Sequence, residues 1–467
     1  MEMNERNRTA RNLGVLCVGL TAAAVLHAQT STFQGSVPTG TASPAPISLT
    51  LRDAIARGLR TNLGFLESDS ASEIARGQRM RALSALLPSV TGEVSQHEEQ
   101  LNLKTVGFNF SFPGVSIPRI VGPFHFTDVR AAASWKAFDY TARKNHQASR
   151  ENEQAARLSA EDARDLVVHG VAAAYLQIIA DSSRTDSIRS QVETAQALYD
   201  RAQDQRRAGT AAGIDVLRSQ VELQQQQQRL LAQRNQFAKD KLALGRAIGF
   251  PSRQDFNIAE TLPYSPMTSL TEEQALQTAH RQRPDFQSYQ ARVRAADEAV
   301  RAARGERYPT GTITADYGDV GPSLGNSHGT FTFVASARFN IFDAGRISSD
   351  VVQAQAELKQ RQDELADLGG QIDYQVRAAF LDLRTAEDQV GVARSSLDLA
   401  NQALAQSRDR FSAGVNDNIE VVQAQESVAA ANDSVIAALY GHNLAKVELA
   451  RAMGAAEQGL ERLMEMK

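Results

Sequence analysis

The chain of 467 residues has one cysteine, little net charge and few aromatic residues, and these shortages exclude several classes of protein. Its only cysteine, Cys17, lies near the N-terminus, so the remaining chain offers no disulfide, no thiolate metal site and no cysteine nucleophile. The net charge is -4, from 50 basic and 54 acidic side chains. This balance lacks the basic excess that nucleic-acid-binding proteins need, so we expect no nucleic-acid partner.

Motifs of catalysis are missing as well. The eight histidines are scattered without an HExxH or other paired spacing, and no Walker loop, GxGxxG or GxSxG motif occurs. His169 and His442 fall in long helix-forming tracts, where we interpret them as polar-face residues rather than metal ligands. We therefore expect no enzymatic activity, no metal and no cofactor.

Only one long apolar run occurs, and it is N-terminal. It extends from Leu13 to Leu26, after a positive stretch that contains Arg6, Arg8 and Arg11. At about 14 residues it is too short to cross ~30 Å of hydrocarbon, which favours a signal peptide at 1–28 over the alternative of a short membrane anchor. Residues 29–48 are rich in Ser, Thr, Gly and Pro and predict a flexible leader. Without another run of about 18 apolar residues, an exported chain can enter a membrane only as a β-barrel.

What the sequence does contain is two long tracts without proline, 124–250 and 323–467, that are rich in helix-forming residues. In the first tract, mainly small apolar residues recur at three- and four-residue steps, a pattern typical of coiled coils. A helix over about 143–205 would be ~95 Å long, far beyond the needs of a globular core. Further along, Gln224 and Gln228 fall on the seam positions, which indicates a tube wall or wet interface rather than a dry core.

Internal repetition is the strongest pattern in the chain. Three motifs occur twice, beginning at Gly209 and Gly414, at Arg246 and Arg451, and at Ser48 and Ser269. The first two, Gly-(x4)-Ile-[DE]-Val and Arg-Ala-[IM]-Gly, recur after 205 residues, and the third, Ser-Leu-Thr, recurs after 221. We interpret the chain as a tandem duplication with repeats at 49–267 and 268–467. The change of offset predicts a 16-residue length difference between Pro88 and Gly209.

Each repeat also contains alternating segments typical of β-strands. In 330–341 the odd positions are apolar and nearly all even positions are polar, and 310–317 alternates likewise. The first repeat has the same pattern over 128–137 and, more weakly, near 90–101, and a turn-rich loop is expected at 318–329. Alternation over ~10 residues is typical of a membrane barrel, and an ordinary antiparallel sheet packed on the helices is the alternative. Four strands cannot close a barrel, whereas three chains would supply twelve.

Taken together, these features resemble the TolC-like outer-membrane efflux protein family, also called outer membrane factors. The resemblance rests on the duplication, on Leu-Thr-(x3)-Ala-[IL] at the start of each repeat, on Gly-(x4)-Ile-[DE]-Val, and on Phe-Asp after each second strand, at Phe138-Asp139 and Phe342-Asp343. It covers roughly residues 48–456 and implies a mainly α-helical fold of tandem coiled-coil hairpins with four strands per chain. Three chains would then form a 12-stranded outer-membrane barrel and a periplasmic helical tunnel.

The same resemblance implies a function and a set of partners. The function is that of a passive exit duct in a tripartite efflux or type I secretion system, located in the outer membrane with a long periplasmic portion. The implied partners are two further copies of the chain, a periplasmic adaptor, an inner-membrane pump and outer-membrane lipid. A periplasmic coiled-coil adaptor or scaffold is the alternative function, although an adaptor needs only one hairpin and no duplication.

In this family the tunnel narrows at the helix tips, where an aromatic residue, a basic residue and acidic residues hold it shut. Position by position, the resemblance implies an aperture formed by Asp215, Phe411, Asn416, Glu420 and Gln423. Phe411 stands where a tyrosine is common, Asn416 where an arginine can occur and Gln423 where a second acid occurs. A differently closed aperture is therefore expected. For Glu420 the alternative is a solvated charge in a first helical turn, stabilised by the helix dipole.

Overall fold

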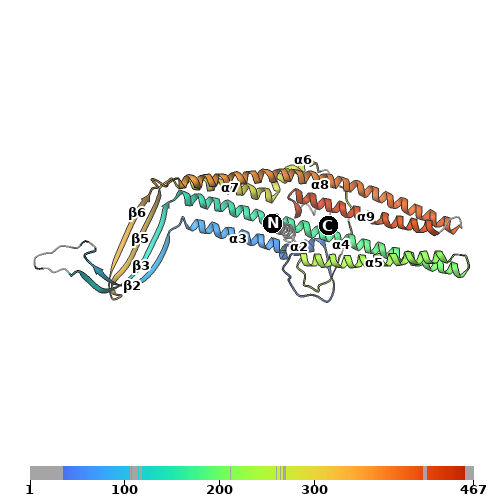
Figure 1. The fold of residues 1–467 in the computed structure, drawn as a ribbon, viewed down its shortest axis with the longest axis horizontal. Helices are drawn as coiled ribbons and strands as arrows, with labels where there is room; N and C mark the ends of the chain where they lie inside the picture. The colour runs from blue at the N-terminus through green and yellow to red at the C-terminus, as the bar shows by residue number, and fades with distance from the viewer. Residues whose placement is uncertain are drawn as a thin grey trace, which may run out of the picture. The chain divides into compact units, whose positions relative to one another are not determined.

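The computed structural model describes residues 35–457, apart from 106, 108–113, 115–117, 211, 259, 263, 267–269 and 414–417. The expected signal peptide at 1–28 and the first part of the expected leader lie outside these residues. The chain forms two compact units (Figure 1). The helical unit draws its residues from Met1–Ser72, Ala156–Ser288 and Ala366–Lys467, and the sheet unit from Glu73–Ala155 and Tyr289–Leu365.

Helices make up most of the described structure, as the proline-free tracts predict. They are α2 (Leu51–Thr61), α3 (Leu63–Ser84), α4 (Tyr140–Arg207), α5 (Gly213–Ala247), α6 (Glu272–Gln282), α7 (Pro284–Gly305), α8 (Arg346–Ser412) and α9 (Asn418–Ala452). Short strands β1 (Ile47–Leu49) and β4 (Phe256–Ile258) pair in parallel, and the longer strands are β2 (Ser89–Asn102), β3 (Ile120–Phe138), β5 (Thr310–Ser323) and β6 (Asn326–Arg338). The helices α4–α5 and α8–α9 form two hairpins, and the helix expected over about 143–205 is confirmed as α4.

Elements in the two halves of the chain correspond in order and length. Helices α2 and α3 and strand β2 have counterparts α6, α7 and β5 221 residues later, and α5 has its counterpart α9 205 residues later. The change of offset falls largely in one connection. Residues 103–119 join β2 to β3, whereas only 324–325 join β5 to β6. The exact repeat boundaries at 49–267 and 268–467 stay a prediction.

The repeated Leu-Thr motifs are helix N-caps. Oγ1 of Thr50 accepts a hydrogen bond from the N–H of Asp53 at 3.1 Å, and Thr271 forms a capping box with Gln274 at the start of α6. Capping satisfies N–H groups that have no partner inside the helix. The alanine four residues after each threonine is fully buried, which explains why its side chain is small.

Repeated glycines end α5 and α9. Gly249 and Gly454 adopt φ of +67° and +69°, a region that favours glycine. A Cβ on Gly249 would lie 2.6 Å from Oγ1 of Thr61, and one on Gly454 would lie 2.6 Å from Cα of Arg283. The glycine of the Arg-Ala-[IM]-Gly motif therefore lets the end of each long hairpin pack closely against the junction of two shorter helices, α2 and α3 in one case and α6 and α7 in the other.

The helical unit buries two apolar clusters. One gathers side chains of α2, α4 and α5 around Tyr175, whose hydroxyl donates to the carbonyl of Leu49 at 2.9 Å. The other gathers side chains of α6, α8 and α9, with Phe380 at the position that corresponds to Tyr175. In the described part of the chain, α4 alone contains a stretch long and apolar enough to cross a membrane by length and composition. Since 56% of that stretch is buried, we interpret it as a core helix.

The four longer strands form one antiparallel sheet in the order β2-β3-β5-β6. The loop expected at 318–329 is wrong for most of its length. Strands β5 and β6 remain paired through Val320 and His328, and only the connection at 324–325 lies outside the two strands. The strand expected over 330–341 ends at Arg338, because its partner strand begins at Thr310 and offers no further backbone groups.

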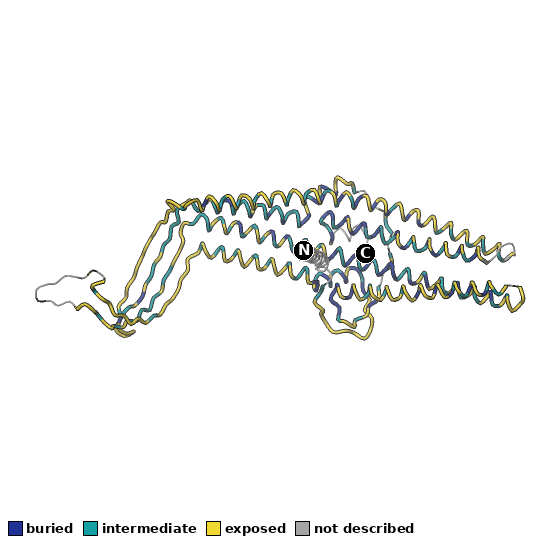
Figure 2. Tube along the Cα trace, viewed as in Figure 1, coloured by how far each residue is buried: buried dark blue, intermediate teal, exposed yellow. Residues whose placement is uncertain are grey.

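Side chains of the paired strands sort into two faces, as their alternation predicts. The apolar face contains Val90, Val94, Ala131, Ala133, Trp135, Ile313, Ala315, Tyr317, Phe331, Phe333 and Ala335. Most of its larger side chains are exposed, to 79% in Phe331, whereas Ile313 is partly buried. In Figure 2, strands β2 and β6 are coloured mainly as exposed. Within the described residues this face is not packed on the helices, so the alternative of an ordinary helix-covered sheet is wrong.

The opposite face of the sheet is polar and internally paired. The guanidinium of Arg130 on β3 contacts Asp128 at 3.2 Å and Asp316 on β5, and it donates to Oγ1 of Thr330 on β6 at 3.1 Å. One residue thus links three neighbouring strands.

A charged cluster in the helical unit joins the end of α9 to α4. Nη2 of Arg451 lies 2.6 Å from Oδ1 of Asp162, and Arg164 binds Glu457 through two hydrogen bonds of 2.9 Å. Burial raises the pKa of Asp165 to about 6. The charge of Arg451 opposes this rise, and the charges of Asp162 and Glu457 add to it.

Candidate functional site

The turns of the two helical hairpins carry the residues that the resemblance assigns to an aperture. Helix α4 is followed by a left-handed glycine, Gly209, with φ of +75°. Its N–H donates to the carbonyl of Arg206 at 3.0 Å, and the N–H of Thr210 donates to that of Gln205 at 2.9 Å. These bonds satisfy carbonyls at the helix end, which explains the glycine of the repeated motif. The equivalent Gly414 lies outside the described residues.

Asp215 lies in the first turn of α5. Its N–H donates to the carbonyl of Ala212 at 3.1 Å, and its Oδ1 lies 3.6 Å from Nη1 of Arg218. Ala212 precedes the helix and has no side chain that could cap it. A carboxylate here is stabilised by the positive end of the helix dipole. Asp215 therefore has a structural explanation, and its function in an aperture stays a prediction.

Glu420 occupies the corresponding place in the first turn of α9. The two hairpins thus each begin their second helix with one carboxylate, at positions 205 residues apart. Gln423 follows one turn later, and its carbonyl accepts a hydrogen bond from Oγ of Ser427 at 2.9 Å. Asn416 lies outside the described residues, so its function in an aperture also stays a prediction.

Phe411, in the last turn of α8, contacts a residue that sequence reasoning missed. The guanidinium carbon of Arg201 on α4 lies 5.5 Å from the centroid of the Phe411 ring, which is a cation–π contact. This contact joins the two hairpins without the hydroxyl that a tyrosine would supply. The two residues are 210 positions apart, so no local motif could have indicated the pair.

An apolar groove of about 470 Å³ lies between the first turns of α5 and α9. It is lined by Ile214, Leu217, Arg218, Val221, Glu222, Gln225, Ile419, Val422, Gln423 and Glu426. The apolar side chains from α5 are about half exposed, which is unusual for three neighbouring aliphatic residues. Of the predicted aperture residues, Gln423 lines this groove. Asp215 and Glu420 each follow a residue that lines it, Ile214 and Ile419.

A second cavity, of about 500 Å³, lies between the same hairpins. Most of the residues that line it have polar side chains. Nδ2 of Asn432 on α9 donates to Oγ of Ser187 on α4 at 2.7 Å, and Oε1 of the buried Gln226 finds no hydrogen-bond partner among the described residues. At this level the joint between the hairpins is therefore polar. The buried glutamine is Gln226, however, whereas Gln224 and Gln228, which the sequence places on the seam, are exposed, so the predicted seam positions are wrong.

The described residues contain no group of three or more His, Cys, Asp or Glu side chains that could hold a metal ion. Nε2 of His169 lies 2.9 Å from Oε1 of Glu448. His442 is fully buried, so the expectation of a polar-face residue is wrong for it. Its ring lies 5.2 Å from that of Tyr264, and burial lowers its pKa, which favours the neutral ring.

Comparison with known proteins identifies the fold and the family. The chain matches the family model described as outer membrane efflux protein over residues 54–250 and 275–455. It is 25% identical to the probable efflux pump outer membrane protein SepC of Pseudomonas putida over 303 residues, which span 62% of this chain and 60% of SepC. The outer membrane protein OprJ of Pseudomonas aeruginosa is 25% identical over 425 residues, which span 85% of this chain and 81% of OprJ.

Among solved structures, the CmeC outer membrane channel of Campylobacter jejuni has the same fold, with a TM-score of 0.74 at 15% identity. The match covers 93% of this chain and 94% of CmeC. Helical hairpins combined with a four-stranded sheet thus place the chain in the fold class of outer-membrane channels. Because the family model covers most of its length, the chain belongs to the outer membrane efflux protein family and is an outer-membrane protein.

Proposed function

We propose that the chain is a passive exit duct, the outer-membrane component of a tripartite efflux or type I secretion assembly. The sheet carries this proposal, because each of its four strands places at least one exposed large apolar side chain on the same face. Soluble proteins rarely expose so continuous an apolar surface, whereas lipid hydrocarbon would cover it favourably.

The edges of the sheet support assembly of three copies. Among the described residues, strands β2 and β6 each pair on one side only. In a membrane, an open edge would leave backbone N–H and C=O groups without partners. Pairing β6 of one copy with β2 of the next removes every edge, and twelve strands from three copies are enough to close a barrel. We therefore propose a homotrimer.

The length of the apolar face supports a membrane-spanning position. On β3 it extends from Val129 to Phe138, about 30 Å along the strand at ~3.3 Å per residue. At a strand tilt of roughly 40°, this corresponds to about 23 Å across the bilayer, close to the ~25 Å apolar band of outer-membrane barrels.

The groove at the hairpin turns supports a helical partner. Ile214, Leu217 and Val221 recur at three- and four-residue steps on α5, and Ile419 of α9 lines the same groove. Such a groove accepts the apolar face of an amphipathic helix, and its rim carries charges of both signs. We propose that a helical hairpin of a periplasmic adaptor docks here and couples the duct to an inner-membrane pump.

The proposed duct needs no catalytic machinery of its own. No nucleotide-binding or hydrolase motif occurs in the sequence, so the energy for transport would come from the pump. The alternative, a periplasmic adaptor or scaffold, requires neither an apolar sheet face nor a second hairpin. Membership of the outer membrane efflux protein family also argues against it.

Thiol labelling on intact cells tests this proposal. Because Cys17 is the only cysteine and lies in the expected signal peptide, single cysteines can be introduced at Ser323, next to the β5–β6 connection, and at Thr210, in the first hairpin turn. An impermeant maleimide should label Ser323→Cys on intact cells, and Thr210→Cys only after the outer membrane is permeabilised. The reverse pattern would overturn the orientation. Recovery of both variants in the soluble periplasmic fraction would favour the adaptor.

A further inference from the structure

Two side-chain amides that line the cavity of about 500 Å³ each have one atom without a hydrogen-bond partner. Among the described residues, Oε1 of Gln226 on α5 accepts no hydrogen bond, and Nε2 of Gln425 on α9 donates none. Gln226 is 4% exposed, so its amide is almost completely removed from the surface. Buried polar atoms are normally paired, because leaving one unpaired is unfavourable. The cavity therefore offers one unused acceptor and one unused donor, from two different hairpins.

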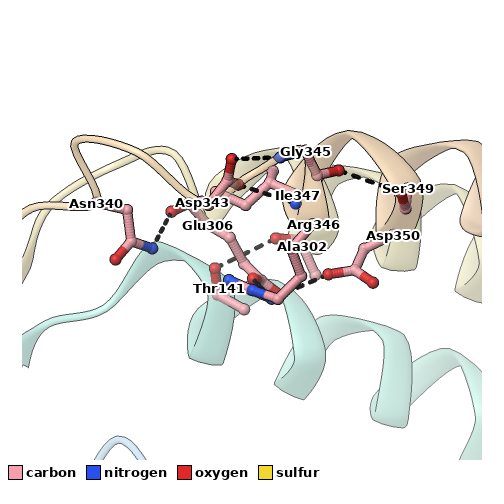
Figure 3. Close-up of polar contacts among 10 residues, drawn as sticks. All are labelled: Thr141, Ala302, Glu306, Asn340, Asp343, Gly345, Arg346, Ile347, Ser349 and Asp350. Carbon is pink, nitrogen blue, oxygen red and sulfur yellow. Dashed lines mark hydrogen bonds and ion pairs between the residues drawn. The ribbon is translucent and has the colours of Figure 1, made fainter.

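The start of α8 shows how the chain satisfies polar groups locally (Figure 3). There the carboxylate of Asp343 accepts hydrogen bonds from the N–H groups of Gly345 at 3.1 Å and Ile347 at 2.9 Å. In the cavity this pairing is incomplete. Nε2 of Gln226 donates to Oε1 of Glu222 at 2.7 Å, whereas Oε1 of the same amide remains over. A molecule bound in the cavity would supply the missing partners.

One wall of the cavity is a row of hydroxyl groups on α4. Ser183, Ser187, Ser190 and Thr194 recur at three- and four-residue steps and so lie on one face of the helix. The hydroxyls of Ser190 and Thr194 donate to carbonyls one turn earlier, at 3.2 Å and 2.9 Å. Oγ of Ser187 accepts a hydrogen bond from Nδ2 of Asn432 at 2.7 Å. Since a hydroxyl oxygen has two lone pairs, this wall can still accept hydrogen bonds from a ligand that carries donors.

Charged side chains line the rim of the cavity rather than its buried part. Asp186, Arg408 and Glu426 are exposed, and Asp186 forms an ion pair of 2.9 Å with Arg189. The buried residues of the lining carry no charge, and they are Ala195, Gln226, Ala429 and Ile436. A charged ligand would lose its hydration there without gaining an opposite charge, whereas a neutral ligand would not incur this cost.

We propose that this cavity binds a neutral polyhydroxylated molecule, a sugar or polyol of mono- or disaccharide size. Its volume lies within the ~300–1,000 Å³ of small-molecule sites. Ligand hydroxyls both donate and accept, so they can pair with Oε1 of Gln226 and Nε2 of Gln425, while the C–H groups of the ligand lie on the alanines and Ile436. The bound molecule would join α5 to α9. The inference goes beyond the proposed duct and does not rest on it, because every lining residue belongs to the helical unit.

Saturation-transfer difference NMR with maltose as the probe tests the site. The full mature chain is purified in lauryldimethylamine oxide, because this detergent has no sugar headgroup that could enter the cavity. Gln226→Leu and Gln425→Leu each remove one unpaired atom and keep a side chain of similar size. Gln224→Leu, at an exposed position of α5, is the matched control. Ser190→Phe places a ring in the cavity from its exposed rim.

We expect maltose to bind the parent protein and the Gln224→Leu control equally. Gln226→Leu and Gln425→Leu should each weaken binding by about tenfold through the loss of one hydrogen bond, and Ser190→Phe should abolish it. Circular dichroism checks that each variant keeps its helices. Gln425 is only partly buried, so its variant provides the test even if Gln226→Leu fails to fold.

Three outcomes would overturn the proposal. Equal maltose signals in all variants would mean binding elsewhere on the protein, and no signal with the parent protein would mean that the cavity holds water alone. A signal with spermidine but not with maltose would mean a cation site. None of these outcomes depends on lipid or on pairing of strands between copies, so the proposed duct is tested separately by the thiol labelling described above.

Discussion

The helical unit and the sheet unit differ in the exposure of their large apolar side chains. In the helical unit, Leu244 and Ile248 are completely buried among side chains of the same chain. In the sheet unit, Phe331 and Phe333 are exposed on a face that nothing in the described chain covers. The comparison teaches that the helical core is complete within one chain, whereas under the proposed function lipid and other copies would cover the apolar face and the edges of the sheet.

Truncation in the helical core gives the largest expected effect. Leu244→Ala should lower the free energy of unfolding by about 2–5 kcal/mol, because it removes transfer energy and leaves a cavity. The matched control is Leu242→Ala, two residues away on α5, where the leucine is 69% exposed and the change should stay within about 0.5 kcal/mol. Thermal unfolding in detergent, followed by circular dichroism, measures both. Equal losses would contradict the assigned burial.

Charge on the apolar sheet face gives the next largest effect. Phe333→Lys should cost about 2–4 kcal/mol in folding into vesicles, because a lysine would have to enter hydrocarbon. Thr332→Lys, one residue away on the polar face and paired in register with Asp316, should cost much less. Denaturant titration of vesicle-inserted protein measures the difference. If both variants fold into vesicles equally well, the apolar face does not contact lipid.

A pH-dependent effect of intermediate size is expected at Asp165 in the helical unit. Burial raises the folded-state pKa of this carboxyl to about 6, so the ionised form is disfavoured in the fold and stability falls as the pH rises from about 4 through 6. Asp165→Asn should therefore raise the thermal midpoint at pH 8 and lose this advantage as the pH falls below about 6. Glu161→Gln, at an exposed position of the same helix, is the control. A gain that does not change with pH would contradict the assignment.

The smallest effect on stability is expected from substitutions at the proposed aperture, where the measured change is in ion selectivity. In a trimer, Asp215 and Glu420 would contribute six carboxylates, which attract cations by focusing the negative field. Asp215→Asn combined with Glu420→Gln should reduce cation selectivity in a planar bilayer under a salt gradient, with little change in trimer stability. Unchanged reversal potentials would leave both residues as ordinary first-turn helix charges.

Much of the fold could be predicted from the sequence, because its signals are local and repeated. Proline-free tracts predicted α4 and α8, and alternation predicted both faces of the sheet. The hairpin at 318–329 could not be predicted, because Gly-Pro and Gly-Asn pairs are typical of turns. There the pairing of β5 with β6 outweighs local preference, and only 324–325 lie outside the strands.

The candidate site was less predictable. First-turn carboxylates follow from helix starts, so Asp215 and Glu420 could be placed from the repeated motif. The Arg201–Phe411 contact depends on how two hairpins pack, and the ring of the buried His442 contacts Tyr264 from the segment between β4 and α6. Neither is encoded by local spacing. The predicted functions of all five aperture residues remain predictions.

The mass of the detergent-solubilised complex tests the central claim most directly. The account predicts three chains per particle, because only copies pairing β6 with β2 can remove the open edges of the sheet. Light scattering corrected for bound detergent should therefore give the protein mass of a trimer of this 50.7 kDa chain, less its signal peptides. A monodisperse single chain whose β2 and β6 amides are nevertheless protected from hydrogen exchange would contradict the account.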